Sequence, residues 1–319
     1  MTAVSEVDPT GLDAELLDCY DDNLQVLARH AGAADVCTPF ARDWGFTTTG
    51  PEREPEFFRE PVERRLRQDT GLVVTWHPAI PSGVDACAAL LAAGRPVLAL
   101  ADAYAMPWLP YAGNAHMTHS FVVDTIEGSR VRIADAYHNN TDWGPARPGR
   151  AAIDTTQLAD LLGEDARMAT LEPGGPPAPP DPADVVRANA QALDVSALRA
   201  YAGRVHRELD DSAATDALAL ACWLGLRSRT RYGRWLDALA RRQPAVAPVA
   251  ARFRDEVVPA WRRASERAHI ARQRARRGRA VPAGAFDALA GPIADAEAAA
   301  ADDSHTASRS TSSRGDEGQ

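Results

Sequence analysis

The chain contains no lysine: all 35 basic residues among its 319 residues are arginines. Without a lysine amine no Schiff base can form, which excludes pyridoxal-phosphate enzymes and lysine-type aldolases. The same absence excludes the phosphotransferases that hold a nucleotide with a P-loop lysine or a kinase strand lysine. Any covalent intermediate must therefore form on another nucleophile.

Cysteine is also scarce, with four residues and no C-x-x-C spacing. They are too few for the disulfide framework of a small secreted protein. The first residues lack the apolar run of a signal peptide, and no stretch approaches the roughly 18 apolar residues of a membrane span. We therefore expect a reduced, cytoplasmic protein with no membrane partner.

The net charge of −9 is unevenly distributed along the chain. Residues 1–182 carry a net charge of −14, residues 183–300 carry +7 and residues 301–319 carry −2. The sign changes at the proline-rich segment 173–182, whose composition is typical of a stiff, extended linker. We place the domain boundary there, after a first domain over residues 1–172. The serine-rich tail has no aliphatic residue larger than alanine, so we expect it to be disordered.

The hydrophobic patterns differ on the two sides of this linker. The N-terminal part mixes patterns of period 3.6 and period 2, which predict both helices and strands. The expected elements are helices over 12–31, 55–68 and 155–163, a helix capped by Ser82, strands over 71–76 and 96–102, and a hairpin over 119–135. Residues 183–300 show helical periodicity throughout. The sequence thus predicts an α+β domain followed by an all-α helical domain.

Cys19 is the first candidate catalytic residue. It lies in the first turns of the predicted helix 12–31, and a helix N-terminus stabilises a thiolate through its dipole and its free N–H groups. Asp18, Asp21 and Asp22 oppose this effect unless their carboxylates point away. The alternative is a buried, inert cysteine.

His119 and Asp135 are the second candidate feature. A hairpin centred on Glu127 aligns three pairs on one face of the sheet: His119–Asp135, Phe121–Ile133 and Val123–Val131. A histidine paired with an aspartate beside an apolar sheet surface is the base and its orienting acid in a catalytic triad. The alternative is a structural hydrogen bond, and a turn centred between Glu127 and Gly128 offsets the pair by one residue.

The spacing of His116 and His119 also invites a metal-binding interpretation. Metal sites need three or four ligands, however, and strand residues three apart point to opposite faces. The sequence therefore predicts no metal site.

Several segments in this order resemble one known family. They are Cys19, the segment DAYAMPWLPY (102–111), the segment HMTHSFVVD (116–124) and a strand ending in Asp135. Together they resemble butirosin biosynthesis protein H and its relatives. The resemblance covers about residues 15–165, and the helical part resembles the domain that follows in such proteins. It departs at Asp124-Thr125, where the family usually has a glycine. The resemblance implies a papain-like or C39-like cysteine-protease fold.

The resemblance also implies an acyltransferase of specialised, antibiotic-type metabolism. An acyl group would arrive as a phosphopantetheine thioester on a carrier protein, with no bound cofactor. It would pass to Cys19 and then to a small-molecule amine, or to an amine within the acyl group in a cyclisation. His119 would deprotonate the amine and Asp135 would orient the histidine. A cysteine hydrolase using the same triad and a non-catalytic binding protein remain open alternatives.

Five further residues are candidates for substrate binding. Asn23, one turn after Cys19, would substitute for the oxyanion glutamine of papain-like enzymes, or else lie on the helix surface. Asp102 and Tyr104 follow a buried strand and would line the pocket, or make structural strand-end hydrogen bonds. Tyr111 and His116 belong to the same resembling segments.

The C-terminal helices are rich in arginine over 227–242 and 262–279. A cationic face attracts an acidic partner, and acyl carrier proteins are acidic. Arg274, Arg276 and Arg277 are the candidate contacts for a carrier protein or for acyl-CoA. The interleaved aromatic residues fit helix packing better than base stacking, so we expect no nucleic-acid partner. A solvated charged face is the alternative interpretation.

Overall fold

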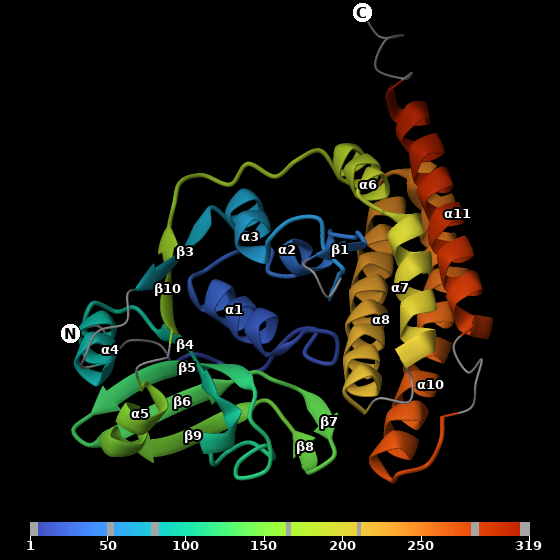
Figure 1. Ribbon diagram of the computed structural model, residues 1–319. Coiled ribbons are helices and arrows are strands. Elements are labelled where there is room, and N and C mark those ends of the chain that lie inside the picture. Colours follow the sequence, from blue (N-terminus) through green and yellow to red (C-terminus); the bar gives the residue numbers. More distant parts are fainter. Residues whose placement is uncertain are drawn as a thin grey trace, which may run out of the picture. The chain divides into compact units, whose positions relative to one another are not determined.

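A computed structural model of the chain describes residues 6–49, 54–77, 83–163, 167–208, 212–281 and 287–312. The protein mixes helices with an antiparallel sheet, and a helical region follows toward the C-terminus (Figure 1). The chain divides into two units. The sheet unit comprises residues 1–40 and 62–179, and the helical unit comprises residues 41–61 and 180–319. The predicted α+β region and helical region are therefore both present.

The sheet unit is built on six strands whose neighbours are all antiparallel. Their spatial order is β3 (Leu72–His77), β10 (Arg167–Pro173), β4 (Val97–Asp102), β5 (Thr118–Glu127), β6 (Arg130–Asp135) and β9 (Gly149–Asp154). A separate hairpin pairs β7 (Asn139–Thr141) with β8 (Gly144–Ala146). Strands β10, β4, β5 and β6 lie inside the sheet. His119, near the start of β5, pairs with Ala101 of β4, and Asp135, at the end of β6, pairs with Gly149 of β9.

One face of this sheet is covered by α1 (Cys19–His30) and α3 (Val62–Thr70). Leu24 and Leu27 of α1 join a core with Leu98, Val122 and Ala134 of the sheet. The sequence pattern predicts a helix from residue 12, but α1 begins only at Cys19. The reason is its cap: Asp18 has an extended backbone, and its carboxylate accepts the Asp21 N–H at 2.9 Å.

The opposite face is covered by α4 (Gly83–Ala92) and α5 (Thr155–Leu161). Here Val97, Phe121 and Ile133 of the sheet pack with residues of both helices. Because alternate strand residues point to opposite faces, this core is separate from the one under α1. The predicted cap of α4, Ser82, lies outside the described residues.

The predicted hairpin over 119–135 is confirmed, but the predicted register is wrong. Val123 pairs with Ile133 and Val122 with Ala134, two residues away from the expected alignment. The turn contains Gly128, with a φ of 60°, and lies between Glu127 and Arg130. An extra residue follows from the pairings, because β5 advances two residues where β6 advances one. Asp124 is this bulged residue.

The helical unit contains α6 (Pro182–Gln191), α7 (Val195–Glu208), α8 (Ser212–Ala240), α9 (Ala247–Arg252), α10 (Val258–Arg276) and α11 (Asp287–Ser312). A π-helical turn, Phe253–Val257, joins α9 to α10. Helices α8 and α10 pack closely where Gly225 faces Trp261. A Cβ on Gly225 would lie 2.4 Å from the Trp261 ring, so this crossing requires glycine.

The predicted domain division is wrong for residues 41–61. This segment includes the short hairpin of β1 (Thr47–Thr49) and β2 (Glu54–Glu56), and it belongs to the helical unit. Its Trp44 indole donates to Glu297 at 2.6 Å, and Glu297 also accepts from Arg229 at 2.7 Å and Trp261 at 2.6 Å. Buried charges need such partners, so this network fixes the segment to α8, α10 and α11.

The described part of the tail differs from the predicted disorder. Residues 301–312 continue α11, whose preceding stretch 296–301 is rich in alanine, the best helix former. Residues 174–181, which the sequence assigns to a linker, form neither helix nor strand between β10 and α6. Within the described ranges, no helix has the length and apolar character needed to cross a membrane.

Candidate active site

Cys19 is the first residue of α1 and is partly exposed. Its carbonyl oxygen accepts the Ser120 hydroxyl at 2.7 Å, which fixes the start of α1 on strand β5. Its side chain packs at the margin of the core that contains Phe121 and Tyr137. The thiol therefore sits at a helix N-terminus, beside the segment that carries His119.

His119 and Asp135 are in direct contact, as the sequence predicts. His119 Nε2 lies 2.8 Å from Asp135 Oδ2, and both side chains are buried. The Trp108 indole donates to the same oxygen at 2.9 Å, and the Tyr137 backbone N–H donates to Oδ1 at 3.0 Å. These donors hold the carboxylate in place, and the carboxylate in turn fixes the orientation of the imidazole.

The pair is strongly coupled electrostatically. Burial alone lowers the pKa of His119, but the charge and hydrogen bond of Asp135, together with those of Cys19, raise it to about 10. Burial raises the pKa of Asp135, but the charge of His119 and the hydrogen bonds from His119, Trp108 and Tyr137 lower it overall. The favoured state at neutral pH is an imidazolium facing a carboxylate.

The second imidazole nitrogen faces the cysteine. Asp135 occupies Nε2, and His119 Nδ1 is buried without an aligned hydrogen-bond partner among the described residues. Cys19 contributes to the pKa of His119 both by charge and by a hydrogen bond, so the thiol lies within interaction range. Cys19, His119 and Asp135 are thus connected in the order nucleophile, base and orienting acid.

Asn23 does not occupy the position predicted for it. Its side chain is fully buried, so Asn23 is neither an oxyanion donor that faces the substrate nor a residue on the helix surface. Its amide Nδ2 donates to the Ser120 carbonyl at 2.8 Å and the Cys19 carbonyl at 3.0 Å, and its Oδ1 accepts the Ala136 N–H at 3.0 Å. Asn23 therefore joins α1 to β5 and to the end of β6, which positions the triad.

Three other predicted binding residues form a separate, exposed group. His116 Nδ1 lies 2.6 Å from Asp102 Oδ2, and the Tyr104 ring stacks on His116 at 4.2 Å. Hydrogen bonds from His116 and from the Tyr104 and Met117 backbones lower the pKa of Asp102. Asp102 and His116 border an open groove of about 660 Å³ that also includes Thr118, the neighbour of His119.

Tyr111 is buried, unlike these three residues. Its hydroxyl lies 3.3 Å from that of Tyr137, a residue that the sequence analysis does not select. Tyr137 also contacts the His119 ring edge to face, with centroids 5.1 Å apart. Trp108 and Tyr137 both contact the triad. Tyr137 could have been indicated by its position two residues after Asp135, and Trp108 by its place in the segment 102–111 that carries the resemblance.

The remaining cysteines lie in different environments. Burial raises the pKa of Cys87 and of Cys222 to about 12, and burial with nearby Asp13 and Asp35 raises that of Cys37 to about 11. These three thiols are held in the protonated form. Among the described residues, no group of three or more histidine, cysteine or acidic side chains could hold a metal ion.

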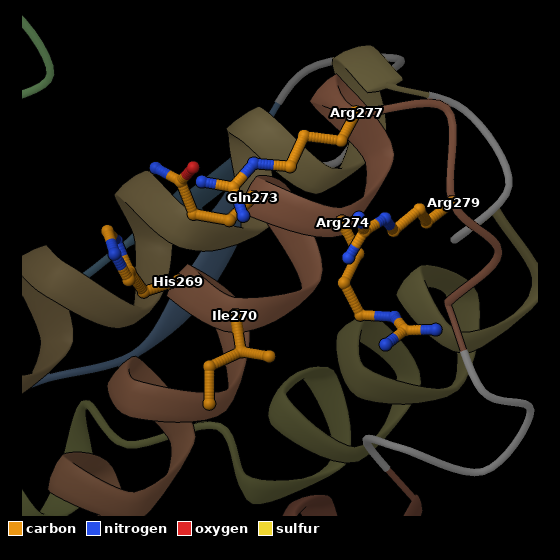
Figure 2. Close-up of a pocket in the computed structure, with 6 residues that line it drawn as sticks. All are labelled: His269, Ile270, Gln273, Arg274, Arg277 and Arg279. Atoms are coloured by element: carbon orange, nitrogen blue, oxygen red, sulfur yellow. The ribbon is translucent and has the colours of Figure 1, made fainter.

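The arginines at the end of α10 line a shallow hollow of about 480 Å³. Figure 2 shows the side chains that surround it: His269, Ile270, Gln273, Arg274, Arg277 and Arg279. Arg274 and Arg277, two of the three candidate partner contacts, therefore both line this hollow. Arg276 is not part of the lining, because its guanidinium pairs with Asp216 of α8 at 3.0 Å. Arg279, which the sequence did not indicate as a contact, is the third arginine that lines the hollow.

No protein-family model matches this chain, and a search of curated proteins found no match. The function must therefore be inferred from the site itself.

Proposed function

We propose that the protein is a cysteine-dependent acyltransferase that moves an acyl group from a thioester to an amine through an acyl-Cys19 intermediate. The observation that carries this proposal is the buried His119–Asp135 pair, joined at 2.8 Å, with its free nitrogen toward a cysteine at a helix N-terminus. The papain-like fold assignment, which rests on the resemblance, is part of the same proposal.

Acylation begins from a thiolate–imidazolium pair. Both the α1 N-terminus and the positive charge of His119 stabilise negative charge on the attacking sulfur. The sulfur attacks the thioester carbonyl, the S–C bond forms, and the carbonyl π electrons move to oxygen. Collapse of this intermediate breaks the bond to the donor sulfur, which leaves with the proton from His119 Nδ1. One thioester replaces another, so the step has little thermodynamic cost.

Transfer then uses the neutral imidazole. An amine attacks the acyl-Cys19 carbonyl, and His119 Nδ1 accepts the proton that the amine loses. Collapse expels the Cys19 thiolate and leaves an amide, with the imidazolium restored. Asp135 stays ionised throughout and stabilises the charged histidine. The exposed group of Asp102, Tyr104 and His116 borders a groove next to Thr118 and is our candidate for acceptor binding.

The α10 hollow is our candidate for binding an acidic acyl carrier protein. Arg277 and Arg279 have no acidic partner within the described part of the chain, so their charges remain available. Exposed Ile270 adds an apolar contact next to them. A patch of this kind, a cationic rim around an apolar residue, complements an acidic helix.

The test is to incubate the protein with an acyl-N-acetylcysteamine thioester and measure its intact mass. We expect one acyl adduct that is absent in Cys19→Ala and retained in Cys37→Ala, a matched control because Cys37 is also partly exposed. Adding an amine should discharge the adduct as an amide. An adduct that persists in Cys19→Ala would refute the assignment, and release of free acid independent of the amine would identify a hydrolase.

A further inference from the structure

The proposed acylation needs a hydrogen-bond donor that the triad does not supply. Negative charge develops on the carbonyl oxygen, and enzymes of this type stabilise it with preorganised donors. The Cys19 backbone N–H is one, because the first N–H groups of a helix have no intrahelical partner. Asn23 cannot be the second, since its amide is buried and fully used.

The Tyr137 side chain contacts the proposed base and is the candidate for such a donor. Tyr137 follows Asp135 by two residues, so its ring shares the face of the sheet that carries His119, and the two rings are in contact. Cys19 packs against the cluster that contains Tyr137. The pKa of Tyr137 is raised chiefly by burial, and the charges of Tyr111 and Cys19 add to the shift. The phenol is therefore protonated and lies within electrostatic range of the thiolate.

The contacts of this hydroxyl are compatible with donation to the oxygen of the reacting carbonyl. Asn139 Nδ2 donates to the Tyr137 oxygen at 2.8 Å, and the Tyr111 hydroxyl lies 3.3 Å away. When Tyr111 donates as well, the Tyr137 oxygen accepts two hydrogen bonds. Its own proton then remains for a third group, and the hydrogen bond from Asn139, which acts to lower the pKa of the phenol, strengthens it as a hydrogen-bond donor.

We propose that the Tyr137 hydroxyl, supported by Asn139, is the second oxyanion donor of the Cys19 site. This inference rests on the proposed acyl transfer. As the Cys19 sulfur bonds to the thioester carbon and the π electrons move to oxygen, Tyr137 donates a hydrogen bond to that oxygen and keeps its proton. The electrons return when the donor thiol leaves, so tyrosine is neither consumed nor ionised.

The test compares two reactions of the same thiol in Tyr137→Phe. Acylation by acetyl-N-acetylcysteamine, followed by rapid quench and intact mass, develops an oxyanion, whereas alkylation by iodoacetamide does not. We expect acylation to slow by about 10²- to 10³-fold, with the alkylation rate unchanged. Tyr20→Phe, which removes a hydroxyl bonded to Glu63 at 2.7 Å, is the matched control and should change neither rate.

A second variant keeps the test informative if Tyr137→Phe does not fold. Asn139→Ala retains the phenol and removes the donor that supports it, so acylation should slow by a smaller factor, with alkylation again unchanged. Acylation at the wild-type rate in Tyr137→Phe, or an equal decrease in both reactions, would overturn the inference while leaving acyl-Cys19 chemistry intact. No adduct in the wild-type protein would overturn the proposed function, and the oxyanion donor with it.

Discussion

Replacing Asn23 with alanine should destabilise the sheet unit as a whole. The side chain joins the start of α1 to β5 and to the end of β6 within a site that excludes water. Its loss leaves at least the Ala136 N–H and the Ser120 carbonyl without these bonds. Each buried unsatisfied group costs about 1–3 kcal/mol, so we expect a loss of about 2–6 kcal/mol. A typical domain is stable by only about 5–15 kcal/mol, so this is a large fraction.

The Asn23→Asp variant separates the effect of lost hydrogen bonds from the effect of lost side-chain volume. Aspartate keeps an acceptor for the Ala136 N–H but places a second acceptor against the Cys19 and Ser120 carbonyls, and close to Asp135. The repulsion between these oxygens adds to the loss of the hydrogen-bond donor. This nearly isosteric substitution should therefore lower the free energy of unfolding at least as much as Asn23→Ala does.

The assay is urea unfolding of wild type and variants, with iodoacetamide reactivity of Cys19 measured in parallel. We expect lower urea midpoints for both variants and slower alkylation, since the contacts that Asn23 makes between α1 and β5 are lost and only the Ser120 bond remains. Asn114→Ala is the matched control, because Asn114 is exposed and bonds only to nearby carbonyls, and such changes stay within about 0.5 kcal/mol. An Asn23→Asp protein as stable as wild type would refute the reasoning.

Two further predictions concern charge. Because the pKa of His119 is raised to about 10, its stabilising effect is complete below about pH 6.5 and disappears as the pH rises through 10. Urea unfolding between pH 7 and 9 should therefore show the wild type losing on the order of 1 kcal/mol per pH unit more than His119→Gln, and parallel slopes would contradict the coupling. The second prediction concerns the α10 hollow. Arg277→Glu combined with Arg279→Glu should lower kcat/KM about tenfold with an acyl carrier protein as donor and leave kcat/KM with an N-acetylcysteamine thioester unchanged. Arg187→Glu, outside the hollow, is the control, and equal losses with both donors would argue against docking there.

Local patterns in the sequence were sufficient for several features of this protein. The hairpin that carries His119 and Asp135 follows from the alternation of apolar residues over a short stretch, although its register does not. The start of α1 was not predicted by these patterns. The hydrophobic pattern predicts a helix from residue 12, whereas the cap at Asp18 makes α1 begin at Cys19. Periodicity cannot distinguish a residue within a helix from one at its end, but an aspartate with an extended backbone can stop the helix there.

Long-range contacts were not accessible in the same way. The segment 41–61 joins the helical unit because Trp44 donates to Glu297, which is 253 positions away along the chain. Nothing near Trp44 indicates that partner. Asn23 presents the same difficulty, since an asparagine one turn into a helix is typical of an exposed face, and its buried partners lie on β5 and beyond β6.

The bulge at Asp124 explains why His119 and Asp135 are in contact as predicted, although the predicted register of the hairpin is wrong. The turn between Glu127 and Arg130 alone would pair Asp135 with Val122, three residues from His119, and an odd offset places two side chains on opposite faces of the sheet. The extra residue in β5 reduces this offset to two residues and restores the shared face. Asp124 is buried, and its carboxylate accepts the Val7 N–H at 3.1 Å and pairs with Arg150 of β9 at 3.3 Å. These contacts fix the extra residue at this position. Asp124 therefore acts on the proposed chemistry from a distance, by setting the face on which the base and its acid meet.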